Sequence, residues 1–363
     1  MRYNWQQKDW PHFQYQIADI EGMLFDFAQR TGRISGVLEG LSETEQTETM
    51  INLMVAEAIK TSEIEGEYLS RTDVMSSIRR NLGLHPELPL TKDKRAAGVA
   101  ELMLAVRNDF PKPLTRQMLL EWHTMLMKGN TQIQVGQWRT HAAPMQIVSG
   151  GMGRETVHFE APPSIRVPSE MDGFIQWFNQ AQDAIEKPVI RAAVAHLYFE
   201  SIHPFEDGNG RIGRAIAEKA LSQAMGRPVL FSLSKSIEGN KQAYYDALQK
   251  AQRSNEITDW ISYFVRTVLD AQMDAEQEIE FTLKKTRFFD THKDVLNARQ
   301  QKVVRRMLEE GYQGFKGGMN ARKYVSLTGV SKATATRDLQ DLVQKGIFKP
   351  IGGGRSTRYE VDL

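Results

Sequence analysis

The chain has 363 residues, of which 41% are hydrophobic and 25% are charged, with no cysteine and a formal net charge of +1. This length and composition indicate two or three folded domains and exclude a disordered or fibrous protein, while the lack of cysteine excludes disulfide scaffolds, thiol nucleophiles and cysteine-ligated metal sites. The N-terminus lacks the apolar core of a signal peptide and no stretch reaches the roughly 18 apolar residues of a membrane span, so we expect a cytoplasmic protein that does not enter a membrane.

Hydrophobic residues recur with the period of a helix through the first three quarters of the chain. In residues 51–59 they fall at positions i, i+3, i+4, i+7 and i+8, which predicts a helix that ends near Glu65-Gly66. Similar patterns predict helices over residues 16–30, 69–81, 94–109, 115–128, 168–186, 188–202, 212–225, 239–253 and 256–285. Two short runs at 145–149 and 156–160, around Ser149–Gly153, predict a β-hairpin on this mainly α body.

The C-terminal part differs in charge and in pattern. Residues 291–363 contain 14 Lys and Arg against 7 Asp and Glu, a net charge of +7, whereas residues 1–290 have a net charge of −6. Helices are predicted near 299–310 and 320–328 and from Ser331, as N-cap, to about Lys345, before a hairpin built from 347–351 and 359–361. This order resembles a winged helix-turn-helix domain.

The strongest chemical signal lies in residues 203–214, which read His-Pro-Phe-Glu-Asp-Gly-Asn-Gly-Arg-Ile-Gly-Arg. Pro204 disfavours helical geometry at His203 and so ends the preceding helix, and a new helix is expected from about Ile212. Between them a Gly-Asn-Gly loop enters a helix N-terminus, where free N–H groups and the helix dipole favour a bound phosphate. The segment therefore predicts a phosphate cradle.

Side chains around this cradle are those that phosphoryl or nucleotidyl transfer requires. Arg211 and Arg214 can each donate two hydrogen bonds to phosphate oxygens, and Asp207 offers the hard oxygen ligand that suits Mg²⁺. His203 titrates near neutral pH and can act as a general base toward an incoming hydroxyl. Together they provide positioning and charge neutralisation, the main demands of this chemistry.

The same run resembles the motif of the Fic family, His-Pro-Phe-x-Asp/Glu-Gly-Asn-Gly-Arg-x-x-Arg, at every fixed position. The resemblance implies a helical core that transfers AMP from its substrate ATP, bound with Mg²⁺, to a Ser, Thr or Tyr hydroxyl of a protein, releasing pyrophosphate. It implies that His203 is the catalytic base, that Phe205 anchors the loop and that Asp207 holds Mg²⁺. The implied anion hole and triphosphate ligands are Gly208, Asn209, Gly210, Arg211 and Arg214.

Three carboxylates crowd the predicted helix end at residues 61–67, where the helix dipole disfavours negative charge, so we expect cationic partners for them. The stretch also resembles the inhibitory motif of the Fic family, Ser/Thr-x-x-x-Glu-Gly/Asn, with Thr61, Glu65 and Gly66 on its fixed positions. The resemblance implies that Glu65 pairs with Arg214 and keeps the γ-phosphate of ATP from seating productively. A solvated glutamate beside a glycine cap is the alternative.

Two further sites are implied by the resemblance. The hairpin at about 145–160 lies where Fic proteins carry the flap that docks the target by main-chain pairing, with an ordinary surface hairpin as the alternative. Asn240, Tyr244 and Tyr245 fall where the family packs adenine, with one tyrosine against the base and the other in the core. Residues 136–139, Gly-Gln-Trp-Arg, resemble another recurring Fic segment, for which we expect a structural role.

The predicted organisation has three parts: residues 1–95 with the inhibitory helix, residues 96–290 as the Fic core, and residues 291–363 as the winged helix. The implied partners are a target protein or the chain itself, and the N-terminal segment leaves a homodimer open. Residues 320–360 could bind DNA or dock a protein, since a winged helix does either. The basic residues expected to contact DNA are Lys332, Arg337, Lys345, Lys349, Arg355 and Arg358.

Three other functions remain open from the residues alone. The same site could remove AMP, because a glutamate near Arg214 could position a water molecule. It could use another nucleotide or transfer another phosphate-containing group. The chain could also be a DNA-binding regulator that takes a nucleotide as ligand, which absence of turnover would indicate.

Overall fold

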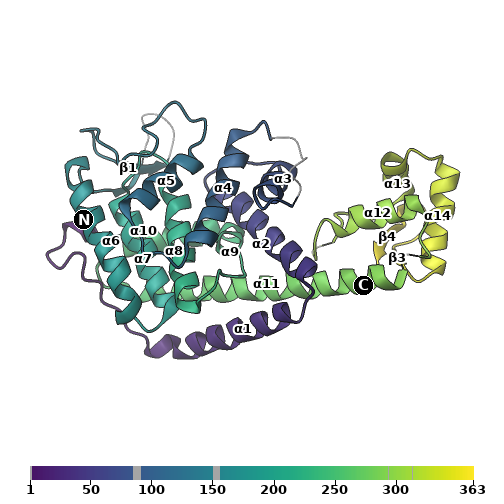
Figure 1. Ribbon diagram of the computed structural model, residues 1–363, viewed down its shortest axis with the longest axis horizontal. Helices are drawn as coiled ribbons and strands as arrows, with labels where there is room; N and C mark the ends of the chain where they lie inside the picture. The colour runs from purple at the N-terminus through teal and green to yellow at the C-terminus, as the bar shows by residue number, and fades with distance from the viewer. Residues whose placement is uncertain (1, 85–90, 150–155, 293, 313) are drawn as a thin grey trace. The chain divides into compact units, whose positions relative to one another are not determined.

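The computed structural model describes residues 2–84, 91–149, 156–292, 294–312 and 314–363, apart from the side chains of Asp183 and Arg355 (Figure 1). The helices are α1 (Glu21–Glu39), α2 (Glu43–Ile64), α3 (Arg71–Asn81), α4 (Lys94–Asp109), α5 (Arg116–Leu126), α6 (Val167–Ala184), α7 (Pro188–Ile202), α8 (Asn209–Met225), α9 (Leu233–Gly239), α10 (Lys241–Ala251), α11 (Thr258–His292), α12 (Ala298–Leu308), α13 (Ala321–Thr328) and α14 (Lys332–Gln344). The strands are β1 (Gln146–Ser149), β2 (Thr156–Glu160), β3 (Phe348–Ile351) and β4 (Arg358–Val361). The mainly α fold class is thus confirmed.

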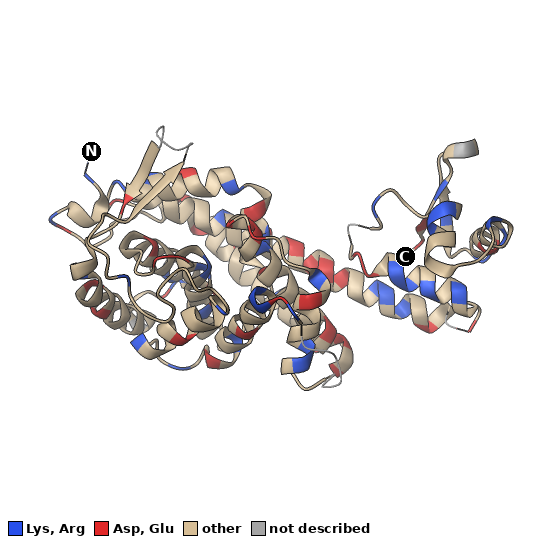
Figure 2. Cartoon of the chain, turned by 90° about the horizontal axis from the view of Figure 1, so that it is seen from above, with Lys and Arg blue, Asp and Glu red and all other residues tan. Residues whose placement is uncertain are grey.

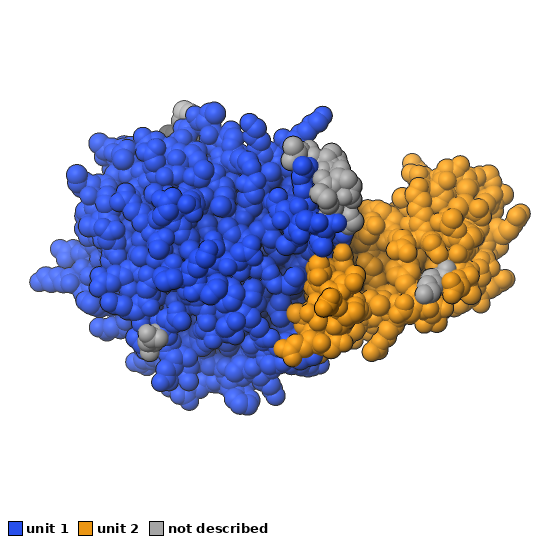
Figure 3. Space-filling model, in the orientation of Figure 1, with its two compact units in different colours: residues 1–36, 50–275 blue, residues 37–49, 276–363 orange. Residues whose placement is uncertain are grey.

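The chain divides into two compact units, one of residues 1–36 and 50–275 and the other of residues 37–49 and 276–363 (Figure 3). None of the described helices is long and apolar enough to cross a bilayer. The candidate site described below lies entirely within the first unit, and the winged helix lies within the second.

Helix α7 forms the centre of the first unit. Nearly all of its residues are buried, because apolar side chains occupy all of its faces rather than a single stripe. Pro188 stands at its first turn, where an N–H group would have no helical partner to lose. Helix α7 packs against α6 and α8, and α8 also packs against α4 and α5. The loop between α7 and α8 is therefore held at both ends by core helices.

The predicted hairpin is present as the antiparallel pair β1 and β2, with Gln146 opposite Glu160 and a register shift after Ile147. Its predicted turn, Gly150–Gly153, lies outside the described residues. The N-terminal segment supports the hairpin, because Trp5 donates its indole N–H to the Glu160 carbonyl at 2.7 Å and Tyr3 packs edge-on against Phe159. These aromatic residues thus form a small core of their own beneath the strands.

The second unit contains the predicted winged helix-turn-helix. Helices α12, α13 and α14 are followed by the antiparallel pair β3 and β4, around a core that includes Val303, Tyr324 and Leu339. Ser331 caps α14 as expected, since its hydroxyl accepts the Thr334 N–H at 3.2 Å. Lys and Arg recur along the helices of this unit (Figure 2).

Several element boundaries differ from the predicted ones. The first helix begins at Glu21 rather than residue 16, because Gln14 pairs with the backbone beside Glu256 and holds its own segment extended. The second difference is that α8 begins at Asn209 rather than at Ile212. Helix α9, only seven residues long, was not predicted, and Asn240 follows it as the N-cap of α10.

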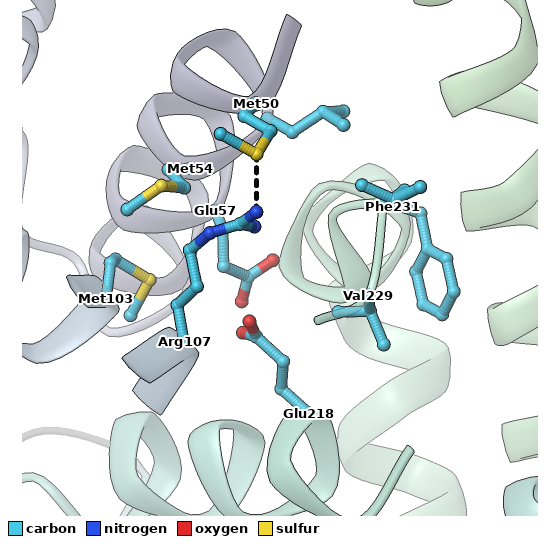
Figure 4. Close-up of a pocket in the computed structure, with 10 residues that line it drawn as sticks. Met50, Met54, Glu57, Met103, Arg107, Glu218, Val229 and Phe231 are labelled. Carbon is cyan, nitrogen blue, oxygen red and sulfur yellow. Dashed lines mark hydrogen bonds between the residues drawn. The ribbon is translucent and has the colours of Figure 1, made fainter. Parts of the chain in front are cut away.

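A pair of carboxyl groups lies in a cavity between α2, α4 and α8, where the side chains of Glu57 and Glu218 point toward one another (Figure 4). Glu57 accepts hydrogen bonds from the Ser232 hydroxyl at 2.7 Å and the Ser234 N–H at 2.9 Å. Arg107, the cation of this cavity, donates to the Met50 sulfur. Burial and the neighbouring charge of Glu57 raise the pKa of Glu218 to about 8.

This pair makes the stability of the protein depend on pH. The pKa of Glu218 rises on folding from its ordinary value of 4.5 to about 8, so the folded state binds more protons between these values and the free energy of unfolding falls as pH rises through this window. We expect the melting temperature to fall less between pH 6 and 8 in Glu218→Gln than in the unmodified chain. Thermal denaturation of both proteins across this range checks this, and parallel curves would contradict it.

Candidate active site between helices α7 and α8

His203 caps α7 in the left-handed conformation, with φ 52° and ψ 60°. Among the described residues it is the only one other than glycine with a positive φ. Such a backbone is costly for a residue with a side chain and persists only where its surroundings impose it. Here Arg139, which is buried, donates its Nε–H to the His203 carbonyl at 2.7 Å and its backbone N–H to the Pro204 carbonyl at 2.9 Å. Through these contacts of Arg139, residues 136–139 have the structural role that was predicted for them.

Phe205 fixes the loop to the core. Its ring is buried and stacks on the His123 imidazole with 3.9 Å between centroids, while Trp138 lies 4.8 Å away on the same ring. The Asn209 side chain closes the loop, because it accepts the Phe205 N–H at 2.9 Å and donates to the Phe205 carbonyl at 2.8 Å. Asn209 was predicted among the phosphate ligands, and its amide braces the loop while its backbone N–H lies in the first turn of α8.

His123 was not predicted, since nothing in its local sequence distinguishes it from other residues of an amphipathic helix. Its Nδ1 accepts the Gly136 N–H at 2.9 Å, so its proton lies on Nε2, which is 3.2 Å from the Asp207 carbonyl. Burial lowers the pKa of His123 to about 4 and keeps the ring neutral. His123 thus holds the backbone of the loop at Asp207.

The N-terminus of α8 lies directly after this loop. Gly208 has φ +83°, a conformation that favours glycine, and its N–H points back to the Asp207 carboxylate at 2.5 Å. The next N–H groups belong to the first turn of the helix, whose donors have no partner within the helix. These groups and the helix dipole form the predicted cradle for an anion.

Both arginines of the motif are paired with the end of α2. Buried Arg214 donates to the Thr61 hydroxyl at 2.8 Å, to the Thr61 carbonyl at 2.9 Å and to the Glu65 carboxylate at 2.8 Å. Arg211 donates to Glu67 at 2.9 Å. Although burial disfavours the charged form, Glu65 holds the pKa of Arg214 above its ordinary value. Because Arg211, Arg214 and Lys60 pair with Glu67, Glu65 and Glu63, the expectation of cations at this helix end is confirmed.

Glu65 lies over the cradle itself. A methyl group added at Gly210 would collide with the Glu65 carboxylate, so the helix N-terminus and this carboxylate are in close contact. Gly66 follows with φ +80°, which lets the chain turn away immediately after the glutamate. The side chain of Glu65 is 30% exposed, whereas that of Arg214 is 1% exposed, so the carboxylate forms the solvent side of the pair.

The three residues of the predicted adenine pocket lie in different environments. Tyr244 is in the core, where its hydroxyl lies 2.8 Å from Nε2 of His196. Tyr245 is 38% exposed and donates to the Ile64 carbonyl at the end of α2. Asn240 is exposed and caps α10. Of the two tyrosines, Tyr245 therefore retains a ring surface that a base could reach, next to Glu65.

Comparisons with known proteins match three segments of the chain. Residues 113–221 match the Fic/DOC family, residues 3–84 match a domain of unknown function (DUF4172), and residues 316–362 match the C-terminal domain of DIP2311-like transcriptional regulators. Two curated relatives, each named protein adenylyltransferase Fic, come from Aedes aegypti and Culex quinquefasciatus. Both are 31% identical, over 171 and 167 residues, which is 46% of this chain and 29% of each relative. The match thus spans less than a third of the length of these relatives.

Solved structures show the same fold. A Fic family protein from Desulfovibrio desulfuricans has a TM-score of 0.53 at 19% identity, over 94% of this chain and 97% of the other. A Fic domain-containing signaling protein from Bacteroides thetaiotaomicron has a TM-score of 0.54 at 17% identity, over 70% of this chain and 97% of the other. With the family match over residues 113–221, which include the whole of the 203–214 segment, these findings show that the chain carries a Fic domain.

Proposed function

We propose that the chain is a protein adenylyltransferase that moves AMP from Mg·ATP to a Ser, Thr or Tyr hydroxyl of a target protein or of itself. The observation that carries the proposal is the arrangement of residues 203–214, where an imposed left-handed turn presents His203 beside a helix N-terminus. Two arginines of that helix, Arg211 and Arg214, could bind phosphate oxygens when they are released from their ion pairs with carboxylates. The names of the insect relatives support the same activity.

In this reaction His203 takes the proton of the target hydroxyl as its oxygen attacks the α-phosphorus. The bond from that phosphorus to the bridging oxygen breaks, and pyrophosphate leaves with the electron pair. The N–H groups at Gly208–Arg211 and the two guanidinium groups neutralise charge on the phosphates. The residues therefore act by positioning and electrostatics, with one proton transfer.

The Asp207 carboxylate fits Mg²⁺ as a ligand that acts together with the phosphates of the substrate. The described residues contain no cluster of three or more His, Asp or Glu that could hold a metal by itself. Asp207 is half-exposed beside the cradle, which suits the usual binding of Mg²⁺ by one or two carboxylates together with substrate phosphates. Bound there with ATP, the ion would supply further neutralisation of phosphate charge.

We further propose that the present arrangement is autoinhibited. The Glu65 carboxylate occupies the space over Gly210 and one donor group of Arg214, where phosphate oxygens would otherwise be placed. Removal of AMP is the second candidate at the same site, because a half-buried carboxylate in this position could orient a water molecule toward a phosphorus.

Labelled ATP separates these functions. The Glu65→Gly variant, incubated with Mg²⁺ and ATP labelled at the α- or the γ-phosphate, should incorporate only the α-label into protein. Incorporation of the γ-label would indicate phosphate transfer instead. Loss of label from modified protein, faster with Glu65 present than without it, would favour removal of AMP as the main activity.

The hairpin at 145–160 is the proposed docking surface for the target. Arg253, in the turn after α10, donates to the His158 carbonyl at 2.7 Å, so β2 is held from this turn as well as from the N-terminal segment. Such support would let the hairpin align an added strand of the target so that the target hydroxyl lies opposite His203.

A homodimer and a cytoplasmic location stay predictions.

DNA is a second proposed partner, through the winged helix. Lys332, Arg337 and Gln340 are exposed on α14. Asp338 is buried and pairs with Arg299 at 3.0 Å, and Asp341, whose side chain is 40% exposed, accepts from Gln300 at 2.7 Å and pairs with Lys345. The exposed face of α14 is therefore basic and polar, as contact with a phosphate backbone requires.

We expect Arg337→Ala to weaken binding to a duplex roughly tenfold, because it removes a charged donor from this face. Lys284→Ala, which removes an exposed lysine paired with Glu280 in the same unit, is the control and should bind as the unmodified chain does. Fluorescence anisotropy at about 50 and 200 mM salt checks both, since phosphate contacts weaken steeply with salt. Absence of any duplex binding at low salt would instead indicate a protein partner for this domain.

A further inference from the structure

A buried carboxylate stands behind the proposed catalytic base. Glu200 lies in the last turn of α7, and the left-handed turn at His203 folds the imidazole back over it, with 3.6 Å between His203 Nδ1 and Glu200 Oε2. The His203 backbone is fixed in this place by Arg139, as described above. The distance is longer than a hydrogen bond, but it lies within the range of an ion pair.

Glu200 has no competing partner of opposite charge in direct contact. Its side chain is 3% exposed, and its Oε1 has no hydrogen-bond partner in the described part of the chain, nor has His203 Nδ1. Arg214, whose charge acts on Glu200, gives its hydrogen bonds to Thr61 and Glu65, and its Nη1 has no partner in the described part of the chain. An ionised carboxylate buried in this way is costly unless hydrogen bonds or a positive charge compensate it.

The neighbouring helix is shaped to admit this carboxylate. A Cβ atom at Gly213 would lie 2.5 Å from Glu200 Oε1, so any larger residue at this position would displace the carboxylate. Gly213 is not a fixed position of the Fic motif, and its contact with Glu200 accounts for the residue found there. Helices α7 and α8 therefore lie close together at this carboxylate.

The other titratable groups around Glu200 favour its ionised form. Burial alone would raise the pKa of Glu200, but His203, His196 and Arg214 together lower it below its ordinary value. His196 lies one turn earlier on α7, and burial lowers its pKa, so it stays neutral against the Tyr244 hydroxyl of α10. Glu65, the residue after α2, is hydrogen-bonded to Arg214.

We propose that Glu200 is a positioning residue for His203: it holds the proton on Nδ1, leaves Nε2 free to accept the hydroxyl proton, and stabilises the imidazolium that results. This inference rests on the proposed function for its catalytic part. In the step, the O–H proton goes to Nε2, the oxygen bonds to the α-phosphorus and pyrophosphate departs. The positive charge that forms on His203 then lies beside a carboxylate that is already in place.

Kinetics test the catalytic part, with Glu65→Gly as the parent. Adding Glu200→Gln should lower kcat roughly 100-fold while KM for ATP changes little, since nucleotide contacts are untouched. The pH at which kcat falls to half on the acid side should drop by about one unit, because an imidazole without its carboxylate is harder to protonate. Glu200→Asp keeps the negative charge but places the carboxylate farther from His203, because its side chain is shorter, and should give an intermediate kcat.

Glu57→Gln in the same parent is the matched control, because it also removes a buried carboxylate but one held by Ser232 and Ser234, in the cavity of Figure 4. Its acid-side profile should equal that of the parent. An unshifted profile in Glu200→Gln, or an equal shift in the control, would overturn the proposal.

The histidine tautomer tests the geometry without any turnover. Nitrogen-15 NMR of histidine-labelled protein, with His203 assigned from the spectrum of His203→Ala, should show the Nδ1–H form in the unmodified chain and its loss in Glu200→Gln. An Nε2–H form in the unmodified chain would overturn the proposal even if neither Glu200 variant folds. If the expected tautomer is found and no variant transfers AMP, the proposed function fails while the role of Glu200 in orienting His203 stands.

Discussion

The Glu65→Gly variant is expected to transfer AMP roughly 10- to 100-fold faster than the unmodified chain. In the structure the Glu65 carboxylate occupies an Arg214 donor at 2.8 Å and covers Gly210, so its removal opens the place where the phosphates of ATP would bind. Arg214 keeps its two hydrogen bonds to Thr61, and we therefore expect its position to change little. Initial rates of label incorporation from α-labelled ATP measure the effect.

Glu63→Gly is the matched control for this prediction. It removes a carboxylate and introduces a glycine two residues earlier on the same helix end, but Glu63 pairs with Lys60 at 2.6 Å rather than with the motif. Its rate should stay within a few-fold of the unmodified chain. Equal activation by both substitutions would mean that loosening α2, rather than freeing Arg214, raises the rate.

His203→Ala, made in the Glu65→Gly parent, is expected to lower transfer by about 10²–10⁴-fold while ATP binding is retained. The reason is that in the proposed reaction the imidazole contacts only the attacking hydroxyl, whereas Arg211, Arg214 and the N-terminus of α8 are the groups proposed to bind the nucleotide. Calorimetric titration with Mg·ATP, beside the rate assay, separates the two effects. Loss of ATP binding in a variant with an unchanged melting temperature would assign His203 a binding role.

Local physical rules accounted for the centre of the site. Pro204 ends α7, glycines flank Asn209, and charge at the end of α2 demands cations, and each of these follows from residues adjacent in sequence. The pairing of Glu65 with Arg214 spans 149 positions, and it was reached through the family motif rather than through local patterning.

The long-range contacts that hold the loop of the site in place could not be predicted from local sequence. His123 braces Asp207 from 84 positions away and Arg139 fixes His203 from 64 positions away, and no local pattern marks either side chain for that contact. The contact of the Asn209 side chain with Phe205 was not predicted either, because a side chain that closes its own loop looks in sequence like one that faces a ligand. Its place in the anion hole stays a prediction. Tertiary pairing likewise moved the start of α1, where Gln14 bonds to the 255–257 segment.

The most direct test of the central claim compares the unmodified chain, Glu65→Gly and Glu65→Gly/His203→Ala, each incubated with Mg²⁺ and α-labelled ATP, with and without cell lysate, by gel and intact mass. We predict label, with the mass of one AMP, on the protein or on a lysate band, strongly for Glu65→Gly and weakly or not at all for the other two. Absence of label from all three, with ATP binding intact, would contradict an inhibited AMP transferase. It would favour AMP removal, another nucleotide, or a DNA-binding regulator that takes nucleotide as ligand.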